Sequence, residues 1–136
     1  MSGKTSVMVE LILAFEKEID VYQLSDNIGI KCSKCKNYNE TKINPITHYR
    51  NPAYWCVNTG YIQTLEAERV IEIFVSLISP SIEKIQKVLV EYMGEAQIYI
   101  VTKVKDGLTP SIGVSRELMR IALQLDTDID FDLYVD

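Results

Sequence analysis

The sequence is poor in the residues that cross-link a chain or carry common catalytic chemistry. Its 136 residues include three cysteines, one histidine and one tryptophan. An odd and small number of cysteines excludes a disulfide-dense secreted scaffold and is typical of a reducing compartment. The single histidine, His48, would have to carry any Ser-His-Asp chemistry alone, and its neighbours Tyr49 and Arg50 offer no acid–base partner. The sequence therefore predicts a protein that is not an enzyme.

Long apolar runs are also absent. The most apolar stretch, residues 7–15, is interrupted by Glu10 and followed by three charged residues without a small-residue cleavage site. A signal peptide and a membrane-spanning helix, which needs ~20 apolar residues, are thereby excluded. Six glycines and four prolines, beside 47% apolar residues, exclude collagen and a disordered chain. We expect a cytoplasmic protein of one domain, 1–136, with no membrane partner.

Negative charge is unevenly distributed along the sequence. The formal net charge is -5, which argues against a nucleic-acid partner because phosphates are bound by Lys and Arg. Residues 126–136 contain five aspartates and no Lys or Arg, whereas the other 125 residues hold 14 acidic and 14 basic side chains. The acidity of the protein is therefore a property of its C-terminal segment.

Hydrophobic periodicity predicts alternating strands and helices. Apolar residues at every second position indicate strands, and a spacing of three to four residues indicates helices. Asp106-Gly107 predicts a hairpin turn between two of the strands. The expected strands are 5–15, 54–59, 96–104, 108–114 and 128–135; the expected helices are 20–28, 64–78, 79–93 and 115–125; and 31–53 is expected to be a loop.

These elements follow the order β-α-β-α-α-β-β-α-β. Intermixed helices and strands with a hairpin predict the α+β class. We expect one mostly antiparallel sheet with helices packed on one face. A ferredoxin-like fold, or a relative with a duplicated βαβ unit, is consistent with this order.

The C-terminal segment is the first candidate site. Asp126, Asp128, Asp130 and Asp132 occupy every second position, and apolar residues lie between them, so a strand would place carboxylates on one face. These residues, with Tyr134, are the partner-binding candidates, and a basic protein is the expected partner. Two alternatives are a solvated face that discourages edge-to-edge aggregation and an adventitious calcium site.

The cysteines form a second candidate site. Cys32 and Cys35 are spaced as in a zinc knuckle, and His48 and Cys56 follow downstream. Four such ligands could close a tetrahedral zinc site, which makes zinc the one cofactor suggested by the sequence. A redox-active pair and incidental thiols are the alternatives, and the pair follows a helix rather than opening one, as a redox pair would.

Aromatic residues form a third candidate site. Tyr54 and Trp55 are adjacent in an expected strand. They either pack in the core or line a pocket for a small molecule. We expect a ligand pocket near this pair if the core is not closed around it.

Several short motifs resemble a known family. The segment Gly113-Val114-Ser115-Arg116-Glu117-Leu118-Met119 begins a helix, and Ile129-Asp130-Phe131-Asp132-Leu133-Tyr134 closes the chain. Together with 24–30, Trp55 and 77–85, these segments resemble the bacterial family named domain of unknown function 4279. Lys31-Cys32-Ser33-Lys34-Cys35 departs from the family pattern, which has a Pro-Ser type turn and a Gly-containing segment there.

The resemblance implies a function but no site residues, because the family has no established catalytic residues. It implies a bacterial protein that binds a partner or neutralises a toxin. We therefore expect a non-catalytic protein-binding module of the immunity type, with a basic toxin as the expected partner. A zinc protein and a small-molecule-binding domain are the alternatives.

Overall fold

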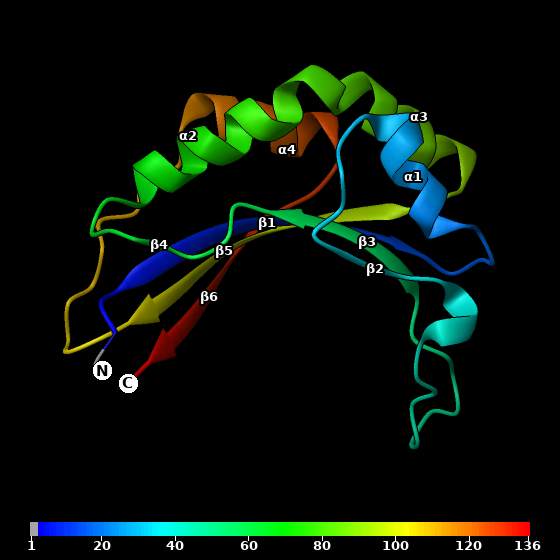
Figure 1. Cartoon of the computed structure of the whole chain (residues 1–136), viewed down its shortest axis with the longest axis horizontal. Coiled ribbons are helices and arrows are strands. Elements are labelled where there is room, and N and C mark those ends of the chain that lie inside the picture. Colours follow the sequence, from blue (N-terminus) through cyan, green and yellow to red (C-terminus); the bar gives the residue numbers. More distant parts are fainter. Residues whose placement is uncertain (1–2) are drawn as a thin grey trace.

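The computed structural model describes residues 3–136 and places the helices on one face of a six-stranded sheet (Figure 1). The strand order is β2-β3-β1-β5-β6, and the short β4 pairs with β1. The strands are β1 (Ser6–Phe15), β2 (Lys34–Lys36), β3 (Ala53–Asn58), β4 (Ile62–Gln63), β5 (Glu95–Val104) and β6 (Ile129–Val135). The helices are α1 (Val21–Ile28), α2 (Ala67–Ile78), α3 (Ile82–Glu91) and α4 (Arg116–Gln124), with short 3-10 turns η1 (Tyr38–Glu40) and η2 (Ser79–Ser81). The predicted α+β class is confirmed.

The central strand is β1, which pairs antiparallel with β3 on one side and with β5 on the other. Its odd-numbered residues face the helix layer and are fully buried, as the period-2 pattern predicted; they are Val7, Val9, Leu11, Leu13 and Phe15. Each helix adds the residues of its apolar stripe to the same core, for example Leu24 of α1, Phe74 of α2 and Ile121 of α4. The core therefore lies between the sheet and the helices.

The edge strand β6 is the exception to antiparallel pairing. It runs parallel to β5, and α4 connects the two strands. A parallel pair needs such a crossover because the chain must return to the starting end of the sheet. The βαβ relationship suggested by the sequence is present here once, whereas the central pair β1/β5 is antiparallel.

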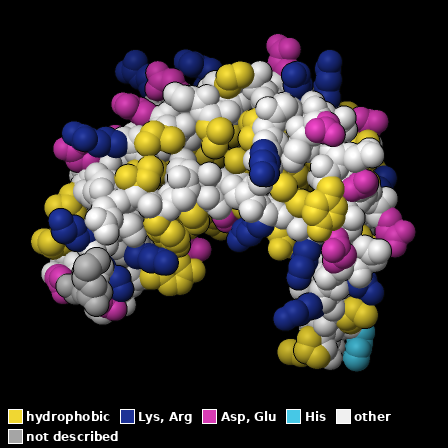
Figure 2. All heavy atoms as spheres, viewed as in Figure 1, with side chains coloured by type: hydrophobic (Ala, Val, Ile, Leu, Met, Phe, Trp, Pro, Cys, Tyr) yellow, Lys and Arg dark blue, Asp and Glu magenta, His cyan; other side chains and the backbone are white. Residues whose placement is uncertain are grey.

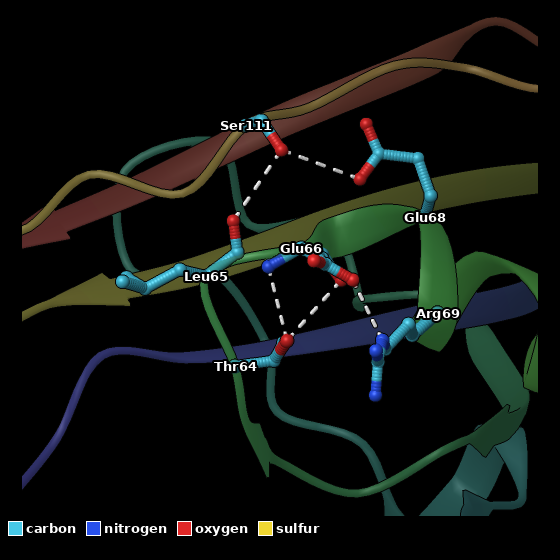
Figure 3. A network of polar contacts seen from close by, with 6 residues as sticks. All are labelled: Thr64, Leu65, Glu66, Glu68, Arg69 and Ser111. Atoms are coloured by element: carbon cyan, nitrogen blue, oxygen red, sulfur yellow. Dashed lines mark hydrogen bonds and ion pairs between the residues drawn. The ribbon is translucent and has the colours of Figure 1, made fainter.

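The predicted strand 108–114 is wrong. The turn before it forms as expected, with Leu108 N–H donating to the Lys105 carbonyl over 3.0 Å and with positive φ at Asp106 and Gly107. Beyond the turn the segment leaves the sheet and lies along the start of α2 (Figure 3). Ser111 N–H donates to the Leu65 carbonyl over 2.9 Å.

A carboxylate on α2 holds the departing segment. Gly113 N–H donates to Glu68 Oε1 over 2.8 Å, and Ala67 N–H donates to the Ser111 carbonyl over 3.1 Å. Figure 3 shows Ser111 reaching toward Leu65 and Glu68, while Arg69 pairs with Glu66 beside them. The backbone groups of Ser111 and the N–H of Gly113 are thus bonded to Leu65 and to the first turn of α2 rather than to β5, so the hairpin has no second strand.

The expected loop 31–53 contains local structure that its polar composition concealed. β2 pairs with β3, and η1 follows it. Thr41 is buried, and its hydroxyl donates to the Asn51 carbonyl over 2.6 Å, which closes the base of loop 41–52. This loop projects from the end of the sheet, beyond the face that the helices leave open (Figure 1).

Candidate functional site

The face of the sheet opposite the helices is the candidate functional surface. In Figure 1 the helices lie above the sheet, and no element of the described chain crosses below it. Figure 2 shows the molecule hollowed on this side, between the strand ends near the two termini and loop 41–52. We call this surface the open face. Its side chains come from the even-numbered positions of β1 and from the residues paired with them.

Strand β6 contributes the acidic side chains of the open face. Its register with β5 places Asp130, Asp132 and Tyr134 beside Tyr99, Val101 and Lys103. The alternate residues of β6 point to the helix side but are poorly covered; Phe131 is 49%, Leu133 57% and Val135 72% exposed. The predicted separation of carboxylates from apolar residues on this strand is thus confirmed.

The backbone of β6 has a free edge. Asp136 N–H donates to the Val104 carbonyl over 3.2 Å, so the backbone groups of Asp136 and of the other even-numbered residues point toward β5. Because successive residues of a strand direct their N–H and C=O groups to opposite sides, those of Phe131, Leu133 and Val135 point away from β5. Among residues 3–136 no strand pairs with this side.

The other two acidic candidates lie before the strand. Asp126 is in the turn after α4, where its φ is 53°, and Asp128 immediately precedes β6. Both are exposed. In the described chain the only ion pair made by the terminal segment joins Lys105 Nζ to Asp136 Oδ2 at 3.3 Å, so Asp126, Asp128, Asp130 and Asp132 are unpaired.

Tyrosines line the open face beside the carboxylates. The pKa of Tyr99 is raised, first by burial and then by Asp130 and Asp132. Burial and the neighbouring Tyr134 raise the pKa of Tyr61, whose ring lies 3.9 Å from Lys103 Nζ. A surface that combines aromatic rings with unpaired carboxylates has the composition of a binding surface for cationic side chains.

Sequence reasoning missed Glu10, which lies at the centre of the open face. It is only 7% exposed, and Asn58 Nδ2 donates to its Oε2 over 3.2 Å. Lys34 Nζ is 4.0 Å away, and Cys56 points to the same side. The sequence did contain a signal for this residue, because Glu10 interrupts an otherwise apolar strand. In the sequence alone it served only as an argument against a signal peptide.

The helix start at 113–119 and the terminal strand carry the resemblance to a known family found in the sequence. The model of the family described as Domain of unknown function (DUF4279) matches residues 5–136. The chain belongs to the DUF4279 family. No curated protein and no solved structure matches it.

The cysteine segment that departs from the DUF4279 pattern brings two sulfurs together. Cys32 Sγ and Cys35 Sγ are 3.2 Å apart, and burial raises the pKa of Cys35 to about 12. Cys35 pairs with Trp55 and faces the helix side, whereas Cys56 faces the open side. Figure 2 shows the histidine, His48, at the far tip of loop 41–52. Among residues 3–136 no three His, Cys, Asp or Glu side chains are gathered for a metal.

The two aromatic candidates in this DUF4279 chain are separated by the sheet. Trp55 is fully buried in the core, and its indole N–H donates to Ser25 Oγ over 3.0 Å. Tyr54 points to the open face and lines a hollow of about 490 Å³ between the sheet and loop 41–52. A pocket therefore exists next to Tyr54, while Trp55 contributes to the core. In residues 3–136 no helix has the length and apolar character needed to cross a membrane.

Proposed function

We propose that this DUF4279 chain is a non-catalytic protein-binding module that takes an extended, basic segment of a partner protein along β6. The observation that carries the proposal is the combination on one strand of a free backbone edge, unpaired carboxylates and exposed apolar side chains. Strand addition of this kind uses the backbone for affinity and alternate side chains for specificity.

The backbone supplies the first part of the argument. An exposed edge strand offers unpaired N–H and C=O groups to another chain, and folded proteins usually shorten, cover or charge such edges. β6 has seven residues and pairs with β5 along its whole length. An incoming strand would bond to the outward groups of Phe131, Leu133 and Val135.

The side chains define the chemistry of the partner. Asp130 and Asp132 on the open face favour Lys or Arg at alternate positions of the incoming strand, because opposite charges on neighbouring strands attract. Phe131 and Leu133 on the other side favour apolar residues between them. A second copy of the chain would bring aspartates against aspartates, so the charge pattern favours a different, basic protein.

A basic toxin is the partner class we propose, with the chain acting in the cytoplasm as an immunity-type inhibitor. A basic enzyme that acts on nucleic acid needs Lys and Arg near its active site, and an acidic strand would compete for those side chains. The five aspartates of residues 126–136 would also accelerate the encounter of the two proteins electrostatically.

The test is affinity capture from a lysate of the native host with three matched baits. The wild-type chain is compared with the charge-reversed variant D128K/D130K/D132K and with E72K/E83K/E91K, which makes the same charge change on exposed positions of α2 and α3. We expect a basic protein to bind the wild type and the helix variant and to be lost from the β6 variant. Equal recovery by all three baits, or recovery of acidic proteins only, would contradict the proposal.

A fourth bait tests strand addition. Leu133→Pro removes an outward N–H without removing a bond to β5, so the sheet should persist, whereas pairing with the partner should fail. Leu133→Thr keeps the N–H and serves as its control. If the proline variant unfolds cooperatively like the wild type and still binds the partner, the contact does not use the edge of β6.

A zinc site is a second candidate function, favoured by the 3.2 Å separation of the Cys32 and Cys35 sulfurs. Two thiolates would supply half of a tetrahedral set. The other predicted ligands, His48 and Cys56, lie apart from this pair. Elemental analysis of protein purified without chelator tests the candidate, because a content well below one zinc per chain would remove it.

A further inference from the structure

The hollow beside Tyr54 supports a second inference, which is independent of the binding proposed for β6. We propose that it is a binding site for a small organic anion, with lysine ammonium groups holding the anionic group and the sheet supporting an apolar or planar body. The hollow lies on the open face between β1, β3, β2 and loop 41–52. Its lining residues are Ile12, Ala14, Lys34, Lys36, Thr41, Lys42, Asn51, Pro52, Tyr54 and Gln97.

The charge of the lining points to an anion. Three lysines line the hollow and no acidic residue does, although the chain carries 19 acidic and 14 basic side chains. Among the described residues Lys36 and Lys42 make no ion pair, and Lys34 meets Glu10 only at 4.0 Å. The positive charges of three lysines around one hollow repel one another, and the attraction of each to a bound anion would offset this repulsion.

The floor of the hollow indicates an organic rather than an inorganic anion. Ile12, Ala14 and Tyr54 are half-buried and present methyl groups and an aromatic ring. A volume of about 490 Å³ lies within the range of small-molecule sites, far above the needs of a single phosphate. Asn51 and Gln97 add uncharged hydrogen-bonding groups at the rim. A planar ring that carries a phosphate or a carboxylate fits this combination.

The site is spatially separate from the proposed protein-binding strand. The lining reaches β5 through Gln97, but its lysines come from β2 and loop 41–52, and β2 lies at the opposite end of the order β2-β3-β1-β5-β6 from β6. Four strand spacings of about 4.8 Å place roughly 19 Å between these edges. Variants at one site should therefore leave binding at the other unchanged.

The experiment is a calorimetric titration of the full chain with phenyl phosphate, benzoate and inorganic phosphate. We expect saturable binding of phenyl phosphate or benzoate with a dissociation constant at or below about 1 mM, and weaker binding of inorganic phosphate, which has no body to contact Tyr54. The two aromatic probes distinguish a phosphate from a carboxylate as the preferred anionic group. Absence of saturation with both aromatic probes would overturn the proposal.

Matched variants locate the site. Lys36→Gln with Lys42→Gln should weaken binding of the aromatic probe about tenfold or more, since each lysine contributes a charge-assisted contact. Lys84→Gln with Lys87→Gln, on exposed positions of α3, makes the same charge change and should have no effect. Tyr54→Ser should weaken phenyl phosphate but not inorganic phosphate. Equal loss in both double variants would show that the probe responds to net charge alone and would reject the site.

Discussion

Cys56 lies in the middle of β3, and none of its side chain is exposed to solvent. Burial raises the pKa of its thiol, and a hydrogen bond to the Glu10 carboxylate adds to the effect. Burial and the adjacent Cys32 likewise raise the pKa of Cys35. Since the thiolate is the nucleophile, both residues should be protonated and unreactive at neutral pH.

Alkylation should therefore be slow in the folded chain. At pH 8 we expect iodoacetamide to modify Cys35 and Cys56 much more slowly than in urea-unfolded protein, with peptide mass spectrometry as the measurement. The unfolded thiols titrate near ~8.5 and the folded ones higher, so this contribution to stability is present below that pH and is lost as the pH rises further. Rapid labelling of Cys56 in the folded chain at pH 8 would contradict its buried position.

Gly94, the residue before β5, lies very close to the end of β1. A Cβ atom built at this position overlaps the ring of Phe15 and lies 3.1 Å from the Ala14 carbonyl oxygen. We expect Gly94→Ala to lower the free energy of unfolding by about 1–3 kcal/mol through overpacking, measured by urea denaturation. Gly60→Ala is the comparison, because nothing lies within 4 Å and only its φ of 73° is strained, which costs about 1–2 kcal/mol. A loss below about 1 kcal/mol at Gly94 would show that Phe15 moves aside freely.

At the scale of elements, one carboxylate adds a side-chain bond to the backbone bonds that join the segment 108–114 to the start of α2. Glu68 accepts the Gly113 N–H over 2.8 Å and lies within reach of Ser111 Oγ at 3.5 Å. Glu68→Ala should speed hydrogen exchange at Gly113 and lower stability by about 1 kcal/mol, because a charge-assisted bond to the backbone is lost. Glu68→Gln keeps a hydrogen-bond acceptor, so its exchange rate and stability should lie between those of the wild type and Glu68→Ala. Unchanged exchange in the alanine variant would mean that the Ser111 backbone bonds alone hold the segment.

The aspartates of β6 should also prevent self-association of the chain through its free edge. Asp130→Asn with Asp132→Asn keeps the size of both side chains but removes the charges that keep two free edges apart. We expect concentration-dependent self-association of this variant by sedimentation or gel filtration, while Glu83→Gln with Glu91→Gln stays like the wild type. A strictly monomeric β6 variant at high concentration would show that charge is not what keeps the edge unpaired.

Periodicity predicted the elements that bury one face and failed where tertiary contacts decide the structure. The alternation in β1 and the apolar stripes of the helices were sufficient to predict these elements, because burial fixes which face of each element points inward. The segment 108–114 alternates in the same way but finds its partners on α2, through Glu68, which no local pattern reveals. β2 was missed because its three residues acquire strand structure only by pairing with β3.

At the scale of the whole molecule, the open face carries clusters of opposite charge at its two ends. The acidic residues of β6 lie at one end, and the lysines of the hollow beside Tyr54 lie at the other. The sequence revealed the first cluster because its aspartates recur at every second position of one short segment. The second could not be seen, since Lys34, Lys36 and Lys42 meet Ile12 and Gln97 only through the order of strands in the sheet.

The charge division gives binding at β6 a characteristic dependence on salt. A synthetic peptide that alternates Lys and Val matches the pattern proposed for the partner strand, and a Glu–Val peptide is its control. Screening lengths shorten from about 10 Å at 0.1 M to about 3 Å at 1 M salt, so long-range attraction disappears while pairing along the edge remains. We expect the association rate of the Lys–Val peptide, measured by stopped-flow fluorescence, to fall about tenfold or more over this range with a smaller change in dissociation. A rate independent of salt, or equal binding of the Glu–Val peptide, would mean that the aspartates of β6 do not steer its partner.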